Sequence, residues 1–137
     1  MPILSQSNAT ATLNGMVADI GTNAPLALYG GTVPAGPDSG LSGDTKLVQG
    51  VVSSWSSPYY NSATSGMSVS GTMSSGSYSP LASGTASFAV ISTSGSVEKQ
   101  QYTVGTSGAE VIVGNTLIQT GVPVAMSLTL TIPSQSV

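Results

Sequence analysis

The sequence predicts an all-β protein, a single-domain, jelly-roll-like antiparallel β-sandwich of about eight strands. Three observations support this prediction. Apolar residues recur at every second position in several short runs, turn-forming Gly-Gly and Ser-Gly pairs separate these runs, and no segment shows the apolar spacing of a helix. Glu, Lys, Arg and Gln, which favour exposed helix faces, are almost missing. A closed up-and-down barrel is the alternative architecture.

The clearest predicted strand is the C-terminal run 122–132, in which every even position is apolar and Ser or Thr residues lie between the later ones. A pleated strand sends these two sets of side chains to opposite faces. The same alternation is present at 67–73, and Ser94-Gly95 lies between two strand-like runs, which predicts a hairpin. Further strands are expected at residues 10–20, 26–30, 46–53, 84–93, 97–105, 110–113 and 116–119.

Two segments lack strand alternation. Residues 32–45 are rich in Pro and Gly and are expected to form a long loop. Residues 53–65 hold Trp55, Tyr59 and Tyr60 among serines. Exposed Trp and Tyr side chains are common anchors of protein-binding surfaces, but these rings can equally cap one end of a core of small residues. Both interpretations stay open at this point.

The length and composition fit one folded domain, because 137 residues with 39% hydrophobic content can build a single core. We expect residues 1–9 to form an N-terminal arm and residues 10–137 to form the β-sandwich. The first residues lack the basic and apolar regions of a signal peptide, and no stretch approaches the roughly 20 apolar residues of a membrane span. We therefore expect a soluble chain that is made in a cytoplasm.

The charge balance excludes two classes of partner. Lys46 and Lys99 are the only cations, against five acidic residues, and the net charge is −3. Nucleic-acid binding requires several Lys or Arg residues to displace counterions from phosphates. A negative net charge also opposes binding to an anionic membrane surface. The sequence therefore predicts no nucleic-acid partner and no membrane partner.

The residue inventory argues against catalysis. The chain has no Cys and no His, so thiolate metal ligands and the commonest general base are missing. A nucleophilic Ser could use only Lys46 or Lys99, and Lys99 lies in a polar run, 98–101, that resembles a solvated strand face. Asp38 and Asp44 share a loop but match neither a dense calcium motif nor a glycosidase pair. We predict no enzyme activity, no cofactor and no metal.

Surface recognition is the remaining class of function. Strands with uncharged Ser and Thr faces can pack against partners with little desolvation of charge. Soluble β proteins usually protect their edge strands with Lys or inward-pointing charges, which this chain almost lacks. We expect neighbouring subunits to cover its edges, by packing or by strand addition, with residues 1–8 pairing with a neighbour. The candidate protein-contact residues are Thr32, Val33, Pro34, Asp38, Leu41, Trp55, Tyr59 and Tyr60.

Two segments resemble small virion proteins of tailed bacteriophages. Residues 26–34, LALYGGTVP, followed by Asp38, resemble a stretch in which an apolar strand leads through Tyr and a small residue to Gly-Thr-x-Pro. Residues 105–116, GTSGAEVIVGNT, resemble the closing half of the same group. There a Gly-Thr-Ser-Gly-Ala-acid turn leads into an apolar strand and Asn-Thr, and the similar pattern continues to Thr131.

The resemblance is to head decoration, or cement, proteins with jelly-roll folds. Such proteins sit outside the major capsid shell and bridge neighbouring capsomers as small oligomers. The resemblance therefore implies a virion location on the capsid exterior, assembly in a host cytoplasm, and two partners: the major capsid protein and further copies of this chain in a dimer or trimer. Residues 53–79 depart from the pattern, because they are longer and richer in serine. A phage tail, fibre or host-recognition β module is the alternative function.

Overall fold

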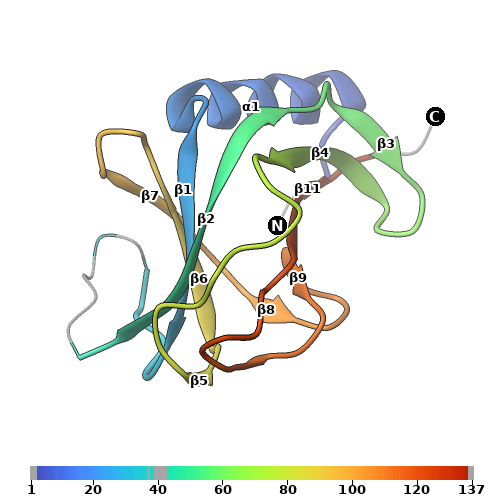
Figure 1. Cartoon of the computed structure of the whole chain (residues 1–137). Helices are drawn as coiled ribbons and strands as arrows, with labels where there is room; N and C mark the ends of the chain where they lie inside the picture. The colour runs from blue at the N-terminus through green and yellow to red at the C-terminus, as the bar shows by residue number, and fades with distance from the viewer. Residues whose placement is uncertain (1–2, 37, 39–42, 136–137) are drawn as a thin grey trace.

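The computed structural model describes residues 3–36, 38 and 43–135 (Figure 1). The all-β, sandwich-like single domain is confirmed, with one helix and more strands than the eight expected. In this part of the chain the elements are α1 (Gln6–Ile20), β1 (Ala24–Gly30), β2 (Thr45–Trp55), β3 (Tyr59–Asn61), β4 (Gly66–Met73), β5 (Gly84–Thr85), β6 (Phe88–Ser92), β7 (Glu98–Tyr102), β8 (Val104–Gly105), β9 (Val111–Val113), β10 (Leu117–Ile118) and β11 (Met126–Pro133).

Nine strands form one continuous sheet. Its order is β7-β6-β1-β2-β4-β11-β9-β8, and β3 pairs with β4 beside the end of β2. Neighbouring strands are antiparallel except for β8 and β9, which are parallel. The short strands β5 and β10 form a separate two-stranded ribbon.

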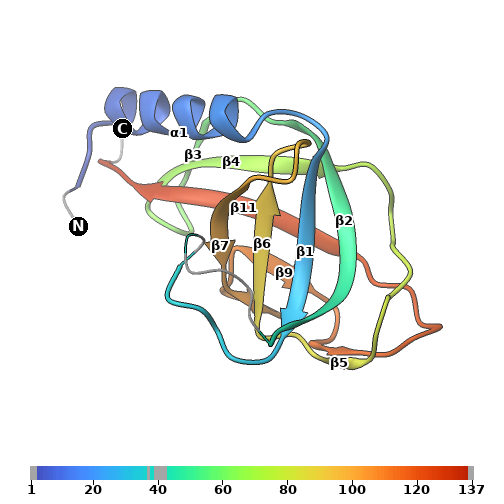
Figure 2. The same cartoon turned by 90° about the vertical axis from the view of Figure 1, so that its left-hand side faces the viewer.

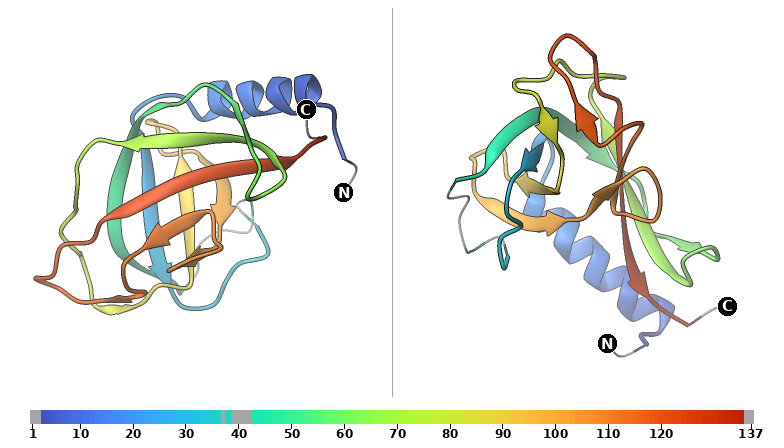
Figure 3. Two further views of the ribbon diagram at one scale, coloured as in Figure 1. Left: turned by 90° about the vertical axis from the view of Figure 1, so that its right-hand side faces the viewer. Right: turned by 90° about the horizontal axis from the view of Figure 1, so that it is seen from below.

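The long strand β2 turns the sheet into two layers. It pairs with β1 as far as Val52 and then with β4 through Trp55, and the register shifts between Val52 and Ser54. Such an irregularity bends a strand, which lets it pass from one layer to the other. Figure 2 shows the result, with β4 and β11 running across the direction of β1 and β6. In Figure 3 (left), β4 and β11 lie side by side in front of that first layer.

The hydrophobic core lies between the two layers, where alternate side chains of each strand meet. Leu26 of β1 lies opposite Ile91 of β6, and Val69 of β4 lies opposite Leu130 of β11. All four side chains are buried in one cluster. The alternation predicted for the two runs 67–73 and 122–132, the second of which forms a strand from Met126, therefore reflects one face turned to this core and one face turned outward.

Strands β1 and β6 also carry apolar residues on their outer face. Ala27, Tyr29, Phe88 and Val90 form a second, smaller buried cluster there. The rings of Tyr29 and Phe88 stack with their centroids 5.3 Å apart. Burial on both faces explains why residues 26–29 read as an unbroken apolar run rather than an alternating one.

The helix α1 corrects the expectation of a strand at residues 10–20 and of a chain without helices. It begins after Ser5, whose Oγ accepts a hydrogen bond from the N–H of Asn8 at 3.2 Å. It ends at Gly21, where φ is 82° and the N–H donates to the carbonyl of Val17 at 2.8 Å. Positive φ is the backbone conformation that glycine adopts most readily.

One stripe of α1 packs on the sheet. Ala9, Leu13 and Ile20 are buried, and Met16 and Val17 are half-buried against the same core. These positions recur with the 3.6-residue period of a helix. Thr and Ala alternate at residues 9–12, and β-branched residues are frequent, so the sequence pattern favoured a strand there. Tertiary packing outweighs that local preference.

Other expected strands differ in their bounds. Residues 84–93 form two strands, β5 and β6, which the segment Ala86-Ser87 separates, and residues 97–105 form β7 and β8. The C-terminal strand begins at Met126, although Val124 already makes an isolated bridge with Tyr78. The hairpin predicted at Ser94-Gly95 is confirmed by the antiparallel pairing of β6 with β7.

The two ends of the described chain meet at one corner. Leu4 lies parallel to Ser134, and the N–H of Gln135 donates to the carbonyl of Leu4 at 2.8 Å. Of the expected N-terminal arm, residues 3–5 lie before α1 and residues 6–9 belong to its first turns. Among the described residues, no helix is long and apolar enough to cross a membrane.

Candidate functional site

The two segments expected to contact partners lie at opposite ends of the domain. The loop of residues 31–44 connects β1 to β2 at the end where Gly30 pairs with Thr45. Trp55 lies at the other end of β2, beyond the pair formed by Ala24 and Val52. The fold therefore does not bring these two candidate contact segments into one surface.

Within the loop, Thr32, Val33 and Asp38 are exposed, and Pro34 is half-buried. The carbonyl of Pro34 accepts a hydrogen bond from Nε2 of Gln101 at 3.1 Å, which fixes the start of the loop to β7. Leu41, the remaining candidate of this loop, lies outside the described residues.

The three aromatic candidates divide between the core and the surface. Trp55 and Tyr60 are half-buried against the hydrophobic core, which matches the interpretation of these rings as a cap. Nε1 of Trp55 donates a hydrogen bond to the carbonyl of Gly21 at 2.9 Å. Tyr59 remains 40% exposed, and its hydroxyl lies 3.0 Å from Oγ of Ser70. Of the three rings, Tyr59 therefore has the most surface to offer to a partner.

The outer side of β4 and β11 is a face of hydroxyl groups. We call it the hydroxyl face. Ser68 lies opposite Thr131, with their side-chain oxygens 2.7 Å apart, and Ser70 lies opposite Thr129. The face offers donors and acceptors without a formal charge, because neither strand contains an ionisable residue. Its exposed and half-exposed members are Ser70, Thr72, Ser127, Thr129 and Thr131, whereas Ser68 is buried.

A groove crosses the hydroxyl face beside the turn that follows β3. Its volume is about 460 Å³. The floor includes Thr129 and Thr131 of β11, and the segment that leads into β9 forms one wall. The residues that line this hydroxyl-face groove are Asn61, Thr64, Gly108, Ala109, Glu110, Ile112, Thr129 and Thr131.

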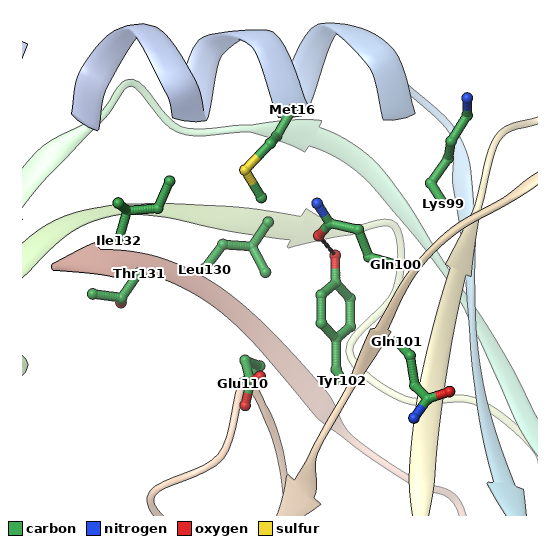
Figure 4. Close-up of a pocket in the computed structure, with 9 residues that line it drawn as sticks. All are labelled: Met16, Lys99, Gln100, Gln101, Tyr102, Glu110, Leu130, Thr131 and Ile132. Carbon is green, nitrogen blue, oxygen red and sulfur yellow. Dashed lines mark hydrogen bonds between the residues drawn. The ribbon is translucent and has the colours of Figure 1, made fainter. Parts of the chain in front are cut away.

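A second hollow lies between β7 and β11, beside α1 (Figure 4). Its volume is about 350 Å³, and we call it the β7–β11 cavity. Met16, Leu130 and Ile132 supply apolar walls, and the ring of Tyr102 lies between them and β7. The other lining residues are polar: Lys99, Gln100, Gln101, Glu110 and Thr131.

Tyr102 stays protonated in this cavity. Burial raises the pKa of its hydroxyl, and the negative charge of Glu110 raises that pKa further. The hydroxyl donates a hydrogen bond of 2.6 Å to Oε1 of Gln100, which Figure 4 shows as a dashed line. The Tyr102 hydroxyl is therefore already engaged as a donor.

The charged residues of the cavity differ in their surroundings. Nζ of Lys99 lies 3.2 Å from Oδ2 of Asp19 on α1, and in Figure 4 its side chain extends away from the other labelled residues. Glu110 accepts a hydrogen bond from Oγ1 of Thr103, and its carbonyl accepts one from the N–H of Thr129 at 3.0 Å. Glu110 and Thr131 line both the cavity and the hydroxyl-face groove, so the two hollows adjoin.

A third surface feature lies at the end of the domain that carries β5 and β10. Leu81, Leu117 and Val122 are exposed there, by 64%, 49% and 54%. The loops that carry them are joined by a hydrogen bond of 3.0 Å from the N–H of Thr120 to Oγ of Ser83. Exposed large apolar side chains on neighbouring loops are typical of surfaces that contact other proteins.

No protein-family model matches the chain, and no curated protein or solved structure matches it. The chemistry of the surface is therefore the guide to function. In the part of the chain that the structure describes, no three His, Cys, Asp or Glu residues lie close enough to hold a metal ion. The hydroxyl face, its groove and the adjoining cavity offer hydrogen bonds, apolar walls and one carboxylate, which suit recognition of another molecule.

Sequence reasoning missed the cavity and the apolar end of the domain. Met16, Tyr102 and Leu130 lie far apart in the chain and meet only because β7, β11 and α1 pack together. One signal was visible, since Glu110 is the last ionisable acid before a long uncharged segment, residues 111–137. Nothing in the sequence showed that the Glu110 side chain borders two hollows.

Proposed function

We propose that this chain is a virion structural protein, a capsid decoration protein that binds the outside of the major capsid shell and stabilises it. The distribution of charge over the fold carries this proposal. Residues 47–97 and 111–137 contain no Asp, Glu, Lys or Arg. These segments include β3, β4, β5, β6, β9, β10 and β11.

An uncharged strand edge supports the same proposal. In the described part of the chain, β3 pairs only with β4, so its other edge has no strand partner. No charged residue protects this edge, whereas the edge strand β7 carries Glu98 and Lys99. Edges of this kind are templates for pairing with another chain. A shell subunit that covers β3 and the hydroxyl face would desolvate no formal charge of β3, β4 or β11, and Glu110 is the one charged residue that lines the groove on this face.

The apolar end around Leu81, Leu117 and Val122 gives a second contact region. Burial of apolar area stabilises an interface by about 25 cal/mol per Å². A hydroxyl face at one side and apolar side chains at one end fit a small protein that bridges two neighbouring subunits. The resemblance of residues 26–34 and 105–116 to decoration proteins points to the same role.

Binding of this kind stabilises a shell by mass action. A partner that binds only the assembled shell adds about 2.7 kcal/mol per site when its concentration is a hundredfold above Kd. Many copies on a symmetric surface also add avidity, so each contact can be modest. A decoration protein of this kind therefore needs a surface that is complementary to the shell and mostly uncharged, and it needs no reactive group.

Copy number in purified particles tests the proposal. Quantitative mass spectrometry is expected to find hundreds of copies per particle, and purified protein added to undecorated shells should raise their melting temperature. A few copies per particle would instead favour the tail or fibre module. Particles that contain none of the chain, or shells that do not change in stability when it is added, would overturn the proposal.

A further inference from the structure

Glu110 occupies an unusual position in the β7–β11 cavity. Its side chain is half-buried and borders both the cavity and the hydroxyl-face groove. Within residues 3–36, 38 and 43–135, the single ion pair joins Lys99 to Asp19, so the Glu110 carboxylate has a hydrogen bond from Thr103 but no ion-pair partner, although Lys99 lines the same cavity. A partly desolvated carboxylate of this kind gains free energy when a cation approaches.

The walls of the cavity indicate what shape of cation fits. Met16, Leu130 and Ile132 present apolar surface, and Tyr102 adds the face of its ring. Lys and Arg side chains bury their methylene stems along apolar surface and keep the charged head at a polar group. A bare metal ion fits less well, because calcium takes six to eight oxygen ligands and this site offers one carboxylate.

We infer that the β7–β11 cavity binds a Lys or Arg side chain of the partner protein, with its stem against Met16, Leu130 and Ile132 and its cation at Glu110. This inference deepens the proposed function and rests on it, since the partner would be the shell subunit. This ion pair would fix how the two proteins align in an otherwise neutral contact, because the partner's cation meets a carboxylate at only one position.

A second copy of this chain is a poor source of that cation. The chain has two cationic side chains in all, Lys46 and Lys99. Nζ of Lys46 donates a hydrogen bond of 2.8 Å to Oε1 of Gln49, and Lys99 is paired with Asp19. Each would have to give up its present partner to reach Glu110 of a neighbour. The occupant is therefore a side chain of a different protein.

Blocked tripeptides test the inference on the isolated protein. Acetyl-Gly-Lys-Gly-amide supplies stem and charge, and acetyl-Gly-norleucine-Gly-amide supplies the stem alone. Titration at low ionic strength, followed by ¹H–¹⁵N NMR, is expected to shift the amide signals of Gln100, Tyr102 and Leu130. We expect the lysine peptide to bind roughly fivefold more tightly than the norleucine peptide, the effect of a partly exposed ion pair.

Two variants make the test specific. Glu110→Gln keeps an acceptor for the Thr103 hydroxyl and removes the charge, so the lysine peptide should lose its advantage. Glu98→Gln makes the same charge change on β7 at a residue that does not line the cavity, so the advantage should remain. The dispersion of the NMR spectrum shows in the same experiment that each variant is folded.

The peptide titration tests the cation site in the cavity independently of the proposed decoration function. Equal affinities for the two peptides, or an advantage that survives in Glu110→Gln, would overturn the cation site. Absence of saturable shifts around the cavity would also overturn it. Because the titration needs no capsid, such a failure would leave the decoration proposal to the copy-number measurement, and failure of that measurement would not alter the peptide result.

Discussion

The indole Nε1–H of Trp55 donates a hydrogen bond of 2.9 Å to the main-chain carbonyl of Gly21, 34 residues earlier in the chain. Gly21 is the residue at which α1 ends, and Trp55 is the last residue of β2. The bond therefore connects the strand that passes between the two layers to the end of the helix. It assigns this ring a structural role that its place in a serine-rich segment did not reveal.

Replacement of Trp55 by Phe should lower the free energy of unfolding by about 1–3 kcal/mol, because the Gly21 carbonyl loses its donor in a partly buried site. Urea denaturation measures the change. Tyr59→Phe is the matched control, since it removes a hydroxyl that bonds only to the Ser70 side chain at the surface. Equal effects of the two substitutions would show that the Trp55–Gly21 bond contributes no particular stability.

Gly15→Ala should stabilise the protein by about 1 kcal/mol, because alanine is the better helix former and loses less conformational entropy on folding. Gly15 lies inside α1 and is exposed, and a Cβ atom there would meet no atom within 4 Å. Thermal unfolding followed by circular dichroism measures the gain. A lower melting temperature would contradict the open space found around Gly15.

Gly66→Ala should have the opposite effect. A Cβ atom at Gly66 would collide with the carbonyl oxygen of Ile132 and lie 2.9 Å from Cγ2 of Thr131. Backbone shifts of this kind cost about 1–3 kcal/mol. The same melting experiment tests it, with Gly15→Ala as the reference for an alanine that meets nothing. An unchanged melting temperature would show that β4 and β11 can separate at this point without cost.

Stability should fall as the pH rises above about 10, the ordinary pKa of a tyrosine hydroxyl. Burial raises the pKa of Tyr102 in the folded protein, so above pH 10 the unfolded chain releases a proton that the folded protein keeps. The stabilisation is therefore complete below pH 10 and is lost as the pH rises toward the folded-state pKa.

Urea denaturation of the wild type and of Tyr102→Phe at pH 9 and pH 11 measures this contribution. The variant should lose less stability between the two pH values than the wild type. Tyr29 shifts in the same direction and is present in both proteins, so the difference isolates Tyr102. Identical losses would contradict a buried, protonated Tyr102.

Thr72→Lys should abolish binding to capsid shells and leave the fold intact. Thr72 lies on the hydroxyl face, is exposed and does not line the groove that Glu110 borders, so a lysine there can reach solvent in the free protein. In a complex the same charge would be buried without a partner, which costs several kcal/mol, so occupancy should fall at least about tenfold. Co-sedimentation with undecorated shells measures it.

The control for this charge is Asn14→Lys, on the exposed side of α1. It adds the same residue at an exposed position that lines neither the hydroxyl-face groove nor the β7–β11 cavity, and it should leave occupancy unchanged. Full occupancy by Thr72→Lys would exclude the hydroxyl face as the surface that meets the shell.

Period-two patterns predicted strands best where one side of the sheet faces the core and the other faces outward. In β11 and β4 the apolar positions, such as Leu130 and Val69, point inward as the alternation required. The helix could not be predicted in the same way, because its stripe from Ala9 to Ile20 is interrupted by Thr, Asn and Gly residues with weak helix preference. Packing against β4 and β11, invisible in the sequence, supplies the missing stability.

The candidate site was only partly predictable. The residue types alone predicted strand faces of uncharged Ser and Thr side chains and strand edges with few charges. The hydroxyl face agrees with the first of these predictions. The aromatic segment needed the structure, since the sequence left core and interface equally open for Trp55, Tyr59 and Tyr60. The β7–β11 cavity needed it most, because its walls come from strands about thirty residues apart that meet only through the bend in the sheet.

The pairing of Leu4 with Ser134 has a practical consequence for labelling and display. The N–H of Ser134 also donates to the carbonyl of Ser65 at 3.3 Å, so both ends of the described chain adjoin the turn between β3 and β4. A label attached at Leu4 or at Gln135 would therefore lie beside the same hairpin. Dyes placed at positions 4 and 135 would remain close neighbours in the folded state and separate on unfolding, which makes the pair a direct fluorescence reporter of folding.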